Sequence, residues 1–431
     1  MNKEGARIAL VGAGGISFGP ITMYGAIRAP GLRGSTLVLI DINEKGLEAA
    51  RAAGERMNAQ MGNPIRIETY TDTARGVRGA DFVMLSVAVD RKRFWKQDYE
   101  IPRKHGSHQD MGECGGPGGL FHSLRSVKLV LEICKTLEKN APDALLLNVT
   151  NPLPRVNLAI HRATKLNCVG ECPEYMFGKL RLSVFLGIPA SEIDAKAAGM
   201  NHFTWFQEIR NAVTGEDLYP KLRRHVKLFP FMHGKLCLAY FEKYGLYPTS
   251  SDSHIGEYLP YTGRGTRSVS EVFPYHRFSG AETGLRSLIT EEVASGRLKL
   301  PMRILPKSFE AGILVLEALA TGASADFGAL NFINDGFVPN LPDGYAVEVA
   351  ARAEKGKLIP KKTAPLPAQL ARLTNNQYEI HSLVVDSVMR HDPDLAYEAL
   401  LRDPLAPRSG AACRRLFDEM LNLQKDKLPF S

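Results

Sequence analysis

The sequence predicts an α/β protein: a parallel sheet covered by helices on both faces, followed by an α+β part. Two observations in the first half carry this prediction. Short apolar stretches alternate with helical stretches, which is the pattern of parallel strands joined by crossover helices. A glycine-rich turn, Gly12-Ala13-Gly14-Gly15, follows the first apolar stretch, as it does in folds that bind a dinucleotide at a strand end.

The order of these stretches predicts a Rossmann-type, doubly wound sheet. The expected strands are residues 7–11, 36–41, 65–70, 81–88, 143–148 and 167–170. The expected helices between them include residues 43–61, a short helix before residue 81, and residues 126–140. These strands end in polar or glycine residues, at the edge where an open α/β sheet binds its ligands.

The glycine turn is a candidate site for the pyrophosphate of a dinucleotide. Gly12 and Gly14 permit a tight turn and close approach of phosphate to the backbone at a helix N-terminus. Ser17 stands where the usual motif has its third glycine, so Gly19 is expected to take that packing role. Asp41 ends the next strand, where a carboxylate binds the ribose and repels a 2′-phosphate, which favours NAD over NADP. The expected contacts to NAD come from Gly12, Gly14, Gly15, Ile16, Ser17 and Asp41.

Residues 90–125 are rich in charge and glycine and predict an irregular binding segment. Five glycines and one proline within residues 112–119 favour close approach of the backbone to a ligand. A plain surface linker is the alternative.

The pattern changes near residue 193. Helical stretches such as residues 308–321 and 377–388 alternate with Gly/Pro-rich joins and a strand-like stretch, residues 346–350. We therefore expect a nucleotide-binding domain over residues 1–195 and an α+β domain over residues 196–431 that contributes to substrate, metal and oligomer contacts. This is a lactate/malate dehydrogenase-like architecture, with the active site in the crevice between the two parts.

Composition argues against several classes of protein. The net charge is +8, but the basic residues are scattered and lack a nucleic-acid-binding signature. We therefore expect no nucleic-acid partner. No apolar run approaches the length of a membrane span, so we expect no membrane partner either. The six cysteines form no disulfide framework, and we expect reduced thiols and a cytoplasmic location.

Three polar positions follow the later strands. Asn151 lies where the nicotinamide should be and offers hydrogen bonds to a sugar or a carboxamide, although a plain Asn-Pro turn is the alternative. Cys172 and His202 each follow a short apolar stretch, so both can reach the ligand edge and hold a divalent metal. A buried structural cysteine and a Cys–His nucleophile pair are the alternatives. Pro173 disfavours the nucleophile, because we expect it to spoil a helix N-terminus that would activate the thiol.

Residues 249–261 gather polar and titratable groups. Asp252, His254, Glu257 and Tyr258 are all candidate acids or bases. Some of these groups must simply cap a helix, and Ser251 or Asp252 fits an N-cap. No pair of carboxylates in this segment marks an ordinary glycosidase, which needs two of them around the scissile bond.

With these motifs in order, the chain resembles glycoside hydrolase family 4, the NAD- and metal-dependent glycosidases. The resemblance covers nearly the whole length and is closest to the α-galactosidase and α-glucosidase side of the family. It rests on VGAGGISFG, DYEIPRKHG, GGPGGLFHSLRSV, NVTNP, the Cys172 turn, GMNHFTWF and SHIGEYLPY, and on NLPDGYAVEV, LPAQLARL and LLRDPLA near the C-terminus.

The resemblance implies hydrolysis through a temporary oxidation. NAD takes hydride from C3 of the sugar, a base removes the C2 proton, the aglycone leaves, water adds, and the hydride returns. It implies Mn²⁺ on Cys172 and His202, and a base at Tyr258 whose pKa must fall below its usual value of about 10. A carbohydrate substrate and a homodimer or homotetramer are also implied. The further site residues are Glu174 and Asp252 for catalysis, and Asn151, Asn201, His202 and Arg125 for the substrate.

Pro173 departs from the family pattern, which places His, Asp or Asn after the metal cysteine. Proline has no proton to give, so Glu174 is the expected substitute, and the substrate stays open among an α-galactoside, an α-glucoside and a uronide. The alternative function is an NAD-dependent dehydrogenase of a hydroxy acid or polyol. That function needs a catalytic His with an Asp and a clamping Arg, which the sequence does not place. A non-catalytic NAD sensor is disfavoured by the titratable residues around Tyr258.

Overall fold

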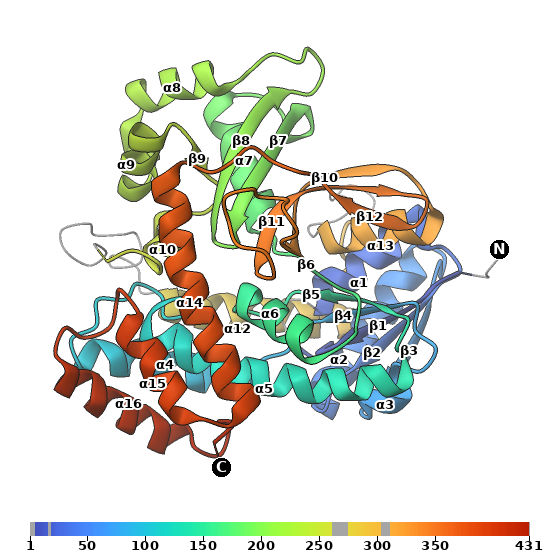
Figure 1. Ribbon diagram of the computed structural model, residues 1–431. Coiled ribbons are helices and arrows are strands. Elements are labelled where there is room, and N and C mark those ends of the chain that lie inside the picture. Colours follow the sequence, from blue (N-terminus) through green and yellow to red (C-terminus); the bar gives the residue numbers. More distant parts are fainter. Residues whose placement is uncertain (1–4, 16–18, 261–274, 303–310, 431) are drawn as a thin grey trace.

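The computed structural model describes residues 5–15, 19–260, 275–302 and 311–430, which contain one mixed sheet with helices on both faces (Figure 1). Its first part is parallel and has the strand order 3-2-1-4-5-6, the order of a Rossmann sheet. These strands are β3 (Arg66–Tyr70), β2 (Thr36–Ile40), β1 (Arg7–Val11), β4 (Phe82–Leu85), β5 (Leu145–Asn148) and β6 (Cys168–Gly170). The order reverses at β1, so a ligand crevice is expected beyond the carboxyl ends of β1 and β4.

The second half of the chain continues this sheet in antiparallel pairs. Its strands follow β6 in the order β10 (Ala325–Ile333), β11 (Ala346–Glu354), β7 (Ile193–Met200), β8 (Phe203–Asn211) and β9 (Tyr247–Pro248), and β12 (Lys357–Pro360) pairs with β11. The expected boundary between residues 195 and 196 falls inside β7. The division into two domains therefore stays a prediction, and the sheet itself runs through both parts.

Helices cover both faces of the parallel strands because side chains alternate along each strand. On β1, Ala9 and Val11 belong to one core, and Ile8 and Leu10 belong to the other. The first core is covered by α5 (Gly116–Asn140), α6 (Leu153–Ala163), α14 (Ala368–Arg390), α15 (Pro393–Arg402) and α16 (Gly410–Gln424). The second is covered by α1 (Gly19–Arg28), α2 (Glu44–Gln60) and α13 (Ala311–Thr321). Each core thus takes residues from both halves of the chain.

A third core lies around β7 and β8, at the top of Figure 1. Its helices are α7 (Glu174–Leu186), α8 (Tyr219–Leu228), α9 (Lys235–Tyr244) and α10 (Asp252–Gly256). The remaining helices are α3 (Thr73–Gly76), α4 (Arg91–Lys104) and α12 (Tyr275–Ser295), with the short turns η1 (Pro30–Leu32), η2 (Ala190–Glu192) and η3 (Pro230–Met232). None of the helices within the described ranges is both long and apolar enough to cross a membrane.

The expectation that residues 90–125 form an irregular segment is wrong. Most of it is helical, as α4 and the first turns of α5. The glycines there allow close contact with other backbone segments of the protein. A Cβ at Gly118 would lie 2.3 Å from the carbonyl oxygen of Asp98, and one at Gly115 would lie 2.1 Å from that of Glu257. Pro117 fits because it lies in the first turn of α5, where a missing N–H costs nothing.

The predicted fold class is confirmed. The expected strands of the first half appear in order, with ends that differ by a few residues, and the strand at residues 346–350 is the start of β11. The expected helix at residues 377–388 is the centre of the longer α14. The helix expected at residues 308–321 corresponds to α13, and its first residues lie outside the described part of the chain.

Candidate active site

The glycine turn packs directly against the ends of β4 and β2. Gly12 has a φ of +94°, and a Cβ there would lie 1.9 Å from the carbonyl oxygen of Ser86, so only glycine fits. The N–H of Gly14 donates a hydrogen bond to Oδ2 of Asp41 at 2.8 Å. The turn and the carboxylate therefore form one polar surface. Two further predicted contacts, Ile16 and Ser17, lie outside the described residues.

A cavity of about 2290 Å³ opens along the carboxyl ends of the parallel strands. The predicted residues that line it are Gly12, Gly15, Asp41, Asn151, Cys172, Glu174, His202 and His254. Pockets for single small molecules usually measure roughly 300–1,000 Å³, so this cavity has room for a dinucleotide and a sugar together. The structure thus brings most of the predicted cofactor and metal residues into one space.

Cys172 and His202 meet at the wall of this cavity. Cys172 follows β6, and His202 lies in the turn between β7 and β8 with a φ of +65°. Sγ of Cys172 is 3.4 Å from Nε2 of His202, within reach of one shared ion whose bonds are about 2.0–2.3 Å long. Burial, reinforced by His254, lowers the pKa of His202 well below its usual value, so the imidazole is neutral, the form that binds a metal. This donor pair fits a divalent transition metal.

Pro173 does not prevent a helix from starting beside Cys172. Helix α7 begins at Glu174 with Pro173 in the N-cap position, so the expectation of a spoiled N-terminus is wrong. Burial, together with the charge of Glu348, nevertheless raises the pKa of Cys172 well above its usual value, against hydrogen bonds from the Glu174 N–H and the Asn201 side chain. The free thiol is therefore protonated at neutral pH and is a poor nucleophile.

His202 also belongs to a buried group with Cys114 and Glu257. One ligand atom from each of the three residues lies within 4.8 Å of the others. Oε1 of Glu257 accepts hydrogen bonds from the N–H groups of Glu113 at 2.6 Å and Cys114 at 3.0 Å. Burial and the charge of Glu113 raise the pKa of Glu257 to about 8. Cys114 and Glu257 do not line the cavity, so a substrate reaches His202 from the Cys172 side. Sequence reasoning missed Cys114, because only the fold brings it to His202.

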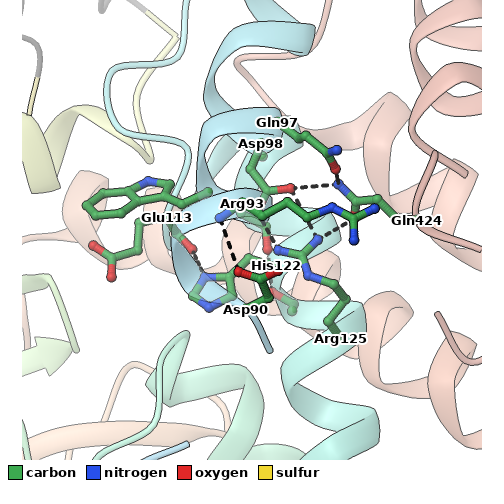
Figure 2. Close-up of polar contacts among 12 residues, drawn as sticks. Asp90, Arg93, Gln97, Asp98, Glu113, His122, Arg125 and Gln424 are labelled. Atoms are coloured by element: carbon green, nitrogen blue, oxygen red, sulfur yellow. Dashed lines mark hydrogen bonds and ion pairs between the residues drawn. The ribbon is translucent and has the colours of Figure 1, made fainter. Parts of the chain in front are cut away.

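Glu113 also lines the cavity, although sequence reasoning did not select it. Its Oε1 accepts a hydrogen bond from Nη2 of Arg91 at 2.7 Å. Its backbone carbonyl lies 2.7 Å from Nδ1 of His122 (Figure 2). Burial pushes its pKa upward, but the charge of Arg91 is the largest of the effects that outweigh burial and hold the pKa at about 2. The sequence feature that could have identified Glu113 is its position just before the glycine-rich start of α5.

Glu174 is the predicted catalytic residue that does line the cavity. Its Oε1 lies 3.4 Å from Nη2 of Arg181, and its Oε2 lies 3.9 Å from Nε2 of His254. The His254 ring centroid is in turn 4.3 Å from that of His202. Glu174, His254 and His202 therefore lie next to one another beside Cys172.

The other two predicted catalytic residues do not line the cavity. Tyr258 is only 2% exposed, and burial, together with nearby acidic groups, raises its pKa well above the usual value, opposite to the shift that a base requires. The Asp252 carboxylate accepts hydrogen bonds from the N–H groups of Leu236 and Cys237 and so caps the start of α9. Both catalytic roles stay predictions that this geometry does not support.

Two predicted substrate residues are also buried away from the cavity lining. Asn201 donates a hydrogen bond to Oε1 of Glu348 at 3.3 Å, next to His202 in the chain. Arg125 forms a two-pronged ion pair with Asp98 and a hydrogen bond to Gln424 of α16 (Figure 2). Arg125 therefore ties α4, α5 and α16 together.

Two family models match successive parts of the chain. The model described as family 4 glycosyl hydrolase matches residues 7–186, and the model of the C-terminal domain of that family matches residues 197–406. The chain belongs to family 4 of the glycosyl hydrolases. The resemblance seen in the sequence motifs is therefore confirmed, and the enzyme is a glycoside hydrolase.

Relatives of this family 4 glycosyl hydrolase match it along almost the whole chain. An α-glucosidase of Erwinia rhapontici is 29% identical over 98% of this chain and 99% of its own. An α-galactosidase of Bacillus subtilis is 28% identical over 92% and 93%, and an α-galacturonidase of Thermoanaerobacter italicus is 24% identical over 99% and 98%. Because these names specify three different sugars, similarity alone does not identify the substrate.

Solved structures of the same fold include a 6-phospho-α-glucosidase from gut microorganisms in complex with NAD and Mn²⁺. It matches this family 4 enzyme with a TM-score of 0.83 at 21% identity and covers 99% of each chain. A malate dehydrogenase of Plasmodium falciparum matches with a TM-score of 0.51 at 12% identity, over 92% of this chain and 99% of its own. These matches confirm the predicted malate dehydrogenase-like architecture.

Proposed function

We propose that this enzyme hydrolyses an α-linked glucoside, galactoside or galacturonide with NAD⁺ and Mn²⁺ as cofactors. The observation that carries the proposal is the meeting of Cys172 and His202, 3.4 Å apart, in the cavity that also contains the glycine turn and Asp41. A glycosidase that relies on two carboxylates alone needs neither feature. The related structure with bound NAD and Mn²⁺ supports the choice of cofactors, and the relatives suggest the sugars.

The residues at the cavity fit both cofactors. The glycine turn offers close approach to a pyrophosphate, Asp41 accepts hydrogen bonds from a ribose, and Asn151 lies at the expected nicotinamide end. Cys172 and His202 would hold the ion. When bound, NAD⁺ supplies a hydride acceptor for C3 of the sugar, and the ion supplies Lewis-acid stabilisation of the neighbouring negative charge.

Groups of the chain must then accept a proton from C2 and give one to the departing oxygen. Glu174 lines the cavity two residues after Cys172, and His254 and Arg181 lie beside its carboxylate. Glu113 stays ionised at neutral pH and, fixed by Arg91, accepts hydrogen bonds from sugar hydroxyls. Tyr258 is retained only as a predicted base.

The alternative of a hydroxy-acid or polyol dehydrogenase rests on the shared fold alone. Membership of a hydrolase family argues for hydrolysis. A dehydrogenase and the proposed glycosidase differ in one product. A dehydrogenase accumulates NADH in proportion to the substrate consumed, whereas the proposed glycosidase returns each hydride to the sugar and accumulates no NADH.

The test uses protein stripped of nucleotide and metal, and 4-nitrophenyl α-glycosides of glucose, galactose and galacturonic acid. We expect cleavage of at least one glycoside when NAD⁺ and Mn²⁺ are both added, and none when either is left out. Cys172→Ser should abolish this activity, whereas Cys168→Ser, a matched change in β6 outside the cavity lining, should keep it. Full cleavage without cofactors, or stoichiometric build-up of NADH, would contradict the proposal.

We further propose that the enzyme is a cytoplasmic homodimer or homotetramer. All six cysteines are free thiols, as in a reducing compartment. An apolar surface at the end of α8 and in η3 supports self-association: Phe229, Phe231 and Met232 are 41%, 81% and 42% exposed. Light scattering of the purified enzyme measures the subunit number, and a monomer at micromolar concentration would contradict the oligomer.

A further inference from the structure

Helix α7 is apolar on two opposite faces. Leu182 and Leu186 on its inner face are buried, whereas Phe177, Leu180 and Val184 on its outer face are 53%, 51% and 67% exposed. A helix that is apolar all round is normally buried on every side. The outer face is therefore a candidate contact surface for an apolar partner.

The beginning of this face belongs to the cavity that contains the metal pair. Phe177 and Leu180 line the cavity together with Cys172 and Glu174, whereas Val184, one turn further on, does not. A helix rises about 1.5 Å per residue, so Phe177 and Leu180 lie about 4.5 and 9 Å along the axis from Glu174. Both apolar side chains therefore line the cavity within two helical turns of Glu174.

The cavity is lined by both polar and apolar side chains. Groups able to bind sugar hydroxyls, such as Asn151, Glu113 and His202, line it together with Cys172. Phe177, Leu180 and Phe327 of β10 are among its apolar lining residues. A glycoside presents both kinds of surface, because its sugar is polar and its aglycone can be aromatic or alkyl.

We infer that the outer face of α7, at Phe177 and Leu180, binds the aglycone of the substrate and selects an aromatic or alkyl aglycone over a second sugar. The inference rests on the proposed glycosidase function and adds a substrate class to it. A second copy of the chain docked on α7 would also cover Val184, which shares the outer face. An aglycone in the cavity reaches only Phe177 and Leu180, and this difference separates the two occupants.

The experiment compares the wild type with the Phe177→Ala/Leu180→Ala double variant, with Val184→Ala as the matched control on the same face. Each protein, with NAD⁺ and Mn²⁺, is assayed on 4-nitrophenyl and methyl α-glycosides of one sugar and on a disaccharide of that sugar. We expect KM for the 4-nitrophenyl glycoside to rise roughly five- to twentyfold in the double variant, the scale of losing an aromatic contact and a buried leucine. KM for the methyl glycoside and the disaccharide should change less than about twofold, and Val184→Ala should match the wild type.

Other outcomes would overturn the inference. One is no change on any substrate; another is an equal loss on all three. A third is a reduced subunit number in the double variant and in Val184→Ala, measured by light scattering, because it would make a second copy the occupant. If the wild type cleaves no glycoside at all, the proposed function itself falls and the aglycone site falls with it. Active wild type with an unchanged KM ratio refutes the aglycone site alone.

Discussion

Two arginine–carboxylate pairs on α4 place the same chemistry in different surroundings. Arg91 pairs with Glu113 at the cavity, and the side chains are 42% and 7% exposed. About two turns along the helix, Asp98 pairs with Arg125, and those side chains are 1% and 3% exposed. The first pair lines the cavity, whereas the Phe94 ring and Gln424 of α16 cover the second. Figure 2 shows Gln424 beside Asp98 and Arg125.

This difference decides what each pair can do. An exposed arginine contributes little to stability, and its charge remains available to a substrate. A buried pair gains little net stability over apolar residues, but breaking it leaves one charge buried without its partner. We therefore assign the Arg91–Glu113 pair to the substrate site and the Asp98–Arg125 pair to holding α4, α5 and α16 together.

The largest expected effect is the loss of Arg125. Arg125→Met should lower the free energy of unfolding by about 3–5 kcal/mol, because the Asp98 carboxylate would remain buried without its cation. Urea denaturation at pH 7 measures the change. The Asp98→Leu/Arg125→Met double variant should recover much of the loss, since it removes both charges. A loss below about 1 kcal/mol in the single variant would show that the pair is not a structural one.

Loss of Arg91 should act on activity instead. Arg91→Met should lower the free energy of unfolding less than Arg125→Met does, because the Arg91 side chain is 42% exposed, and should lower kcat/KM by roughly ten- to a hundredfold. It should also raise the pKa of Glu113 from about 2, because its main cation is gone, so the acid limb of the pH profile of kcat/KM moves to higher pH. Arg93→Met is the matched control, because Arg93 is an exposed residue of α4 that does not line the cavity. Equal losses of kcat/KM in Arg91→Met and Arg93→Met would contradict the assignment of Arg91 to the substrate site.

The smallest effect at pH 5 is expected for a substitution of Glu257, whose pKa is raised to about 8. The folded protein keeps this proton at pH values where the unfolded chain, with a pKa of about 4.3, has lost it. The stability contribution is therefore full below about pH 4.3 and declines as the pH rises toward 8. In metal-free protein, Glu257→Gln should remove this decline and change stability at pH 5 by less than about 1 kcal/mol. Urea titrations at several pH values measure the slope, and an unchanged slope would assign the decline to another group.

Local patterns in the sequence predicted the parallel sheet, the glycine turn and Asp41, because strand, turn and acid are close in the chain. The segment over residues 90–125 was not predicted, because its glycines fit contacts such as that of Gly115 with Glu257, far away in the sequence. Glu113 was missed for the same reason. Arg125 was assigned to the substrate and Arg91 was not, because sequence alone does not show which arginine faces the cavity. Cys172 and His202 came from their motifs, and folding brings them together.

The central claim is that the glycosidic bond breaks after a proton leaves C2 of the sugar. The most direct measurement is cleavage in D₂O, with NAD⁺ and Mn²⁺ present, followed by NMR of the released sugar. The account predicts deuterium at C2 of the product at every turnover. A product that keeps its original C2 hydrogen while cleavage runs at full rate would contradict it.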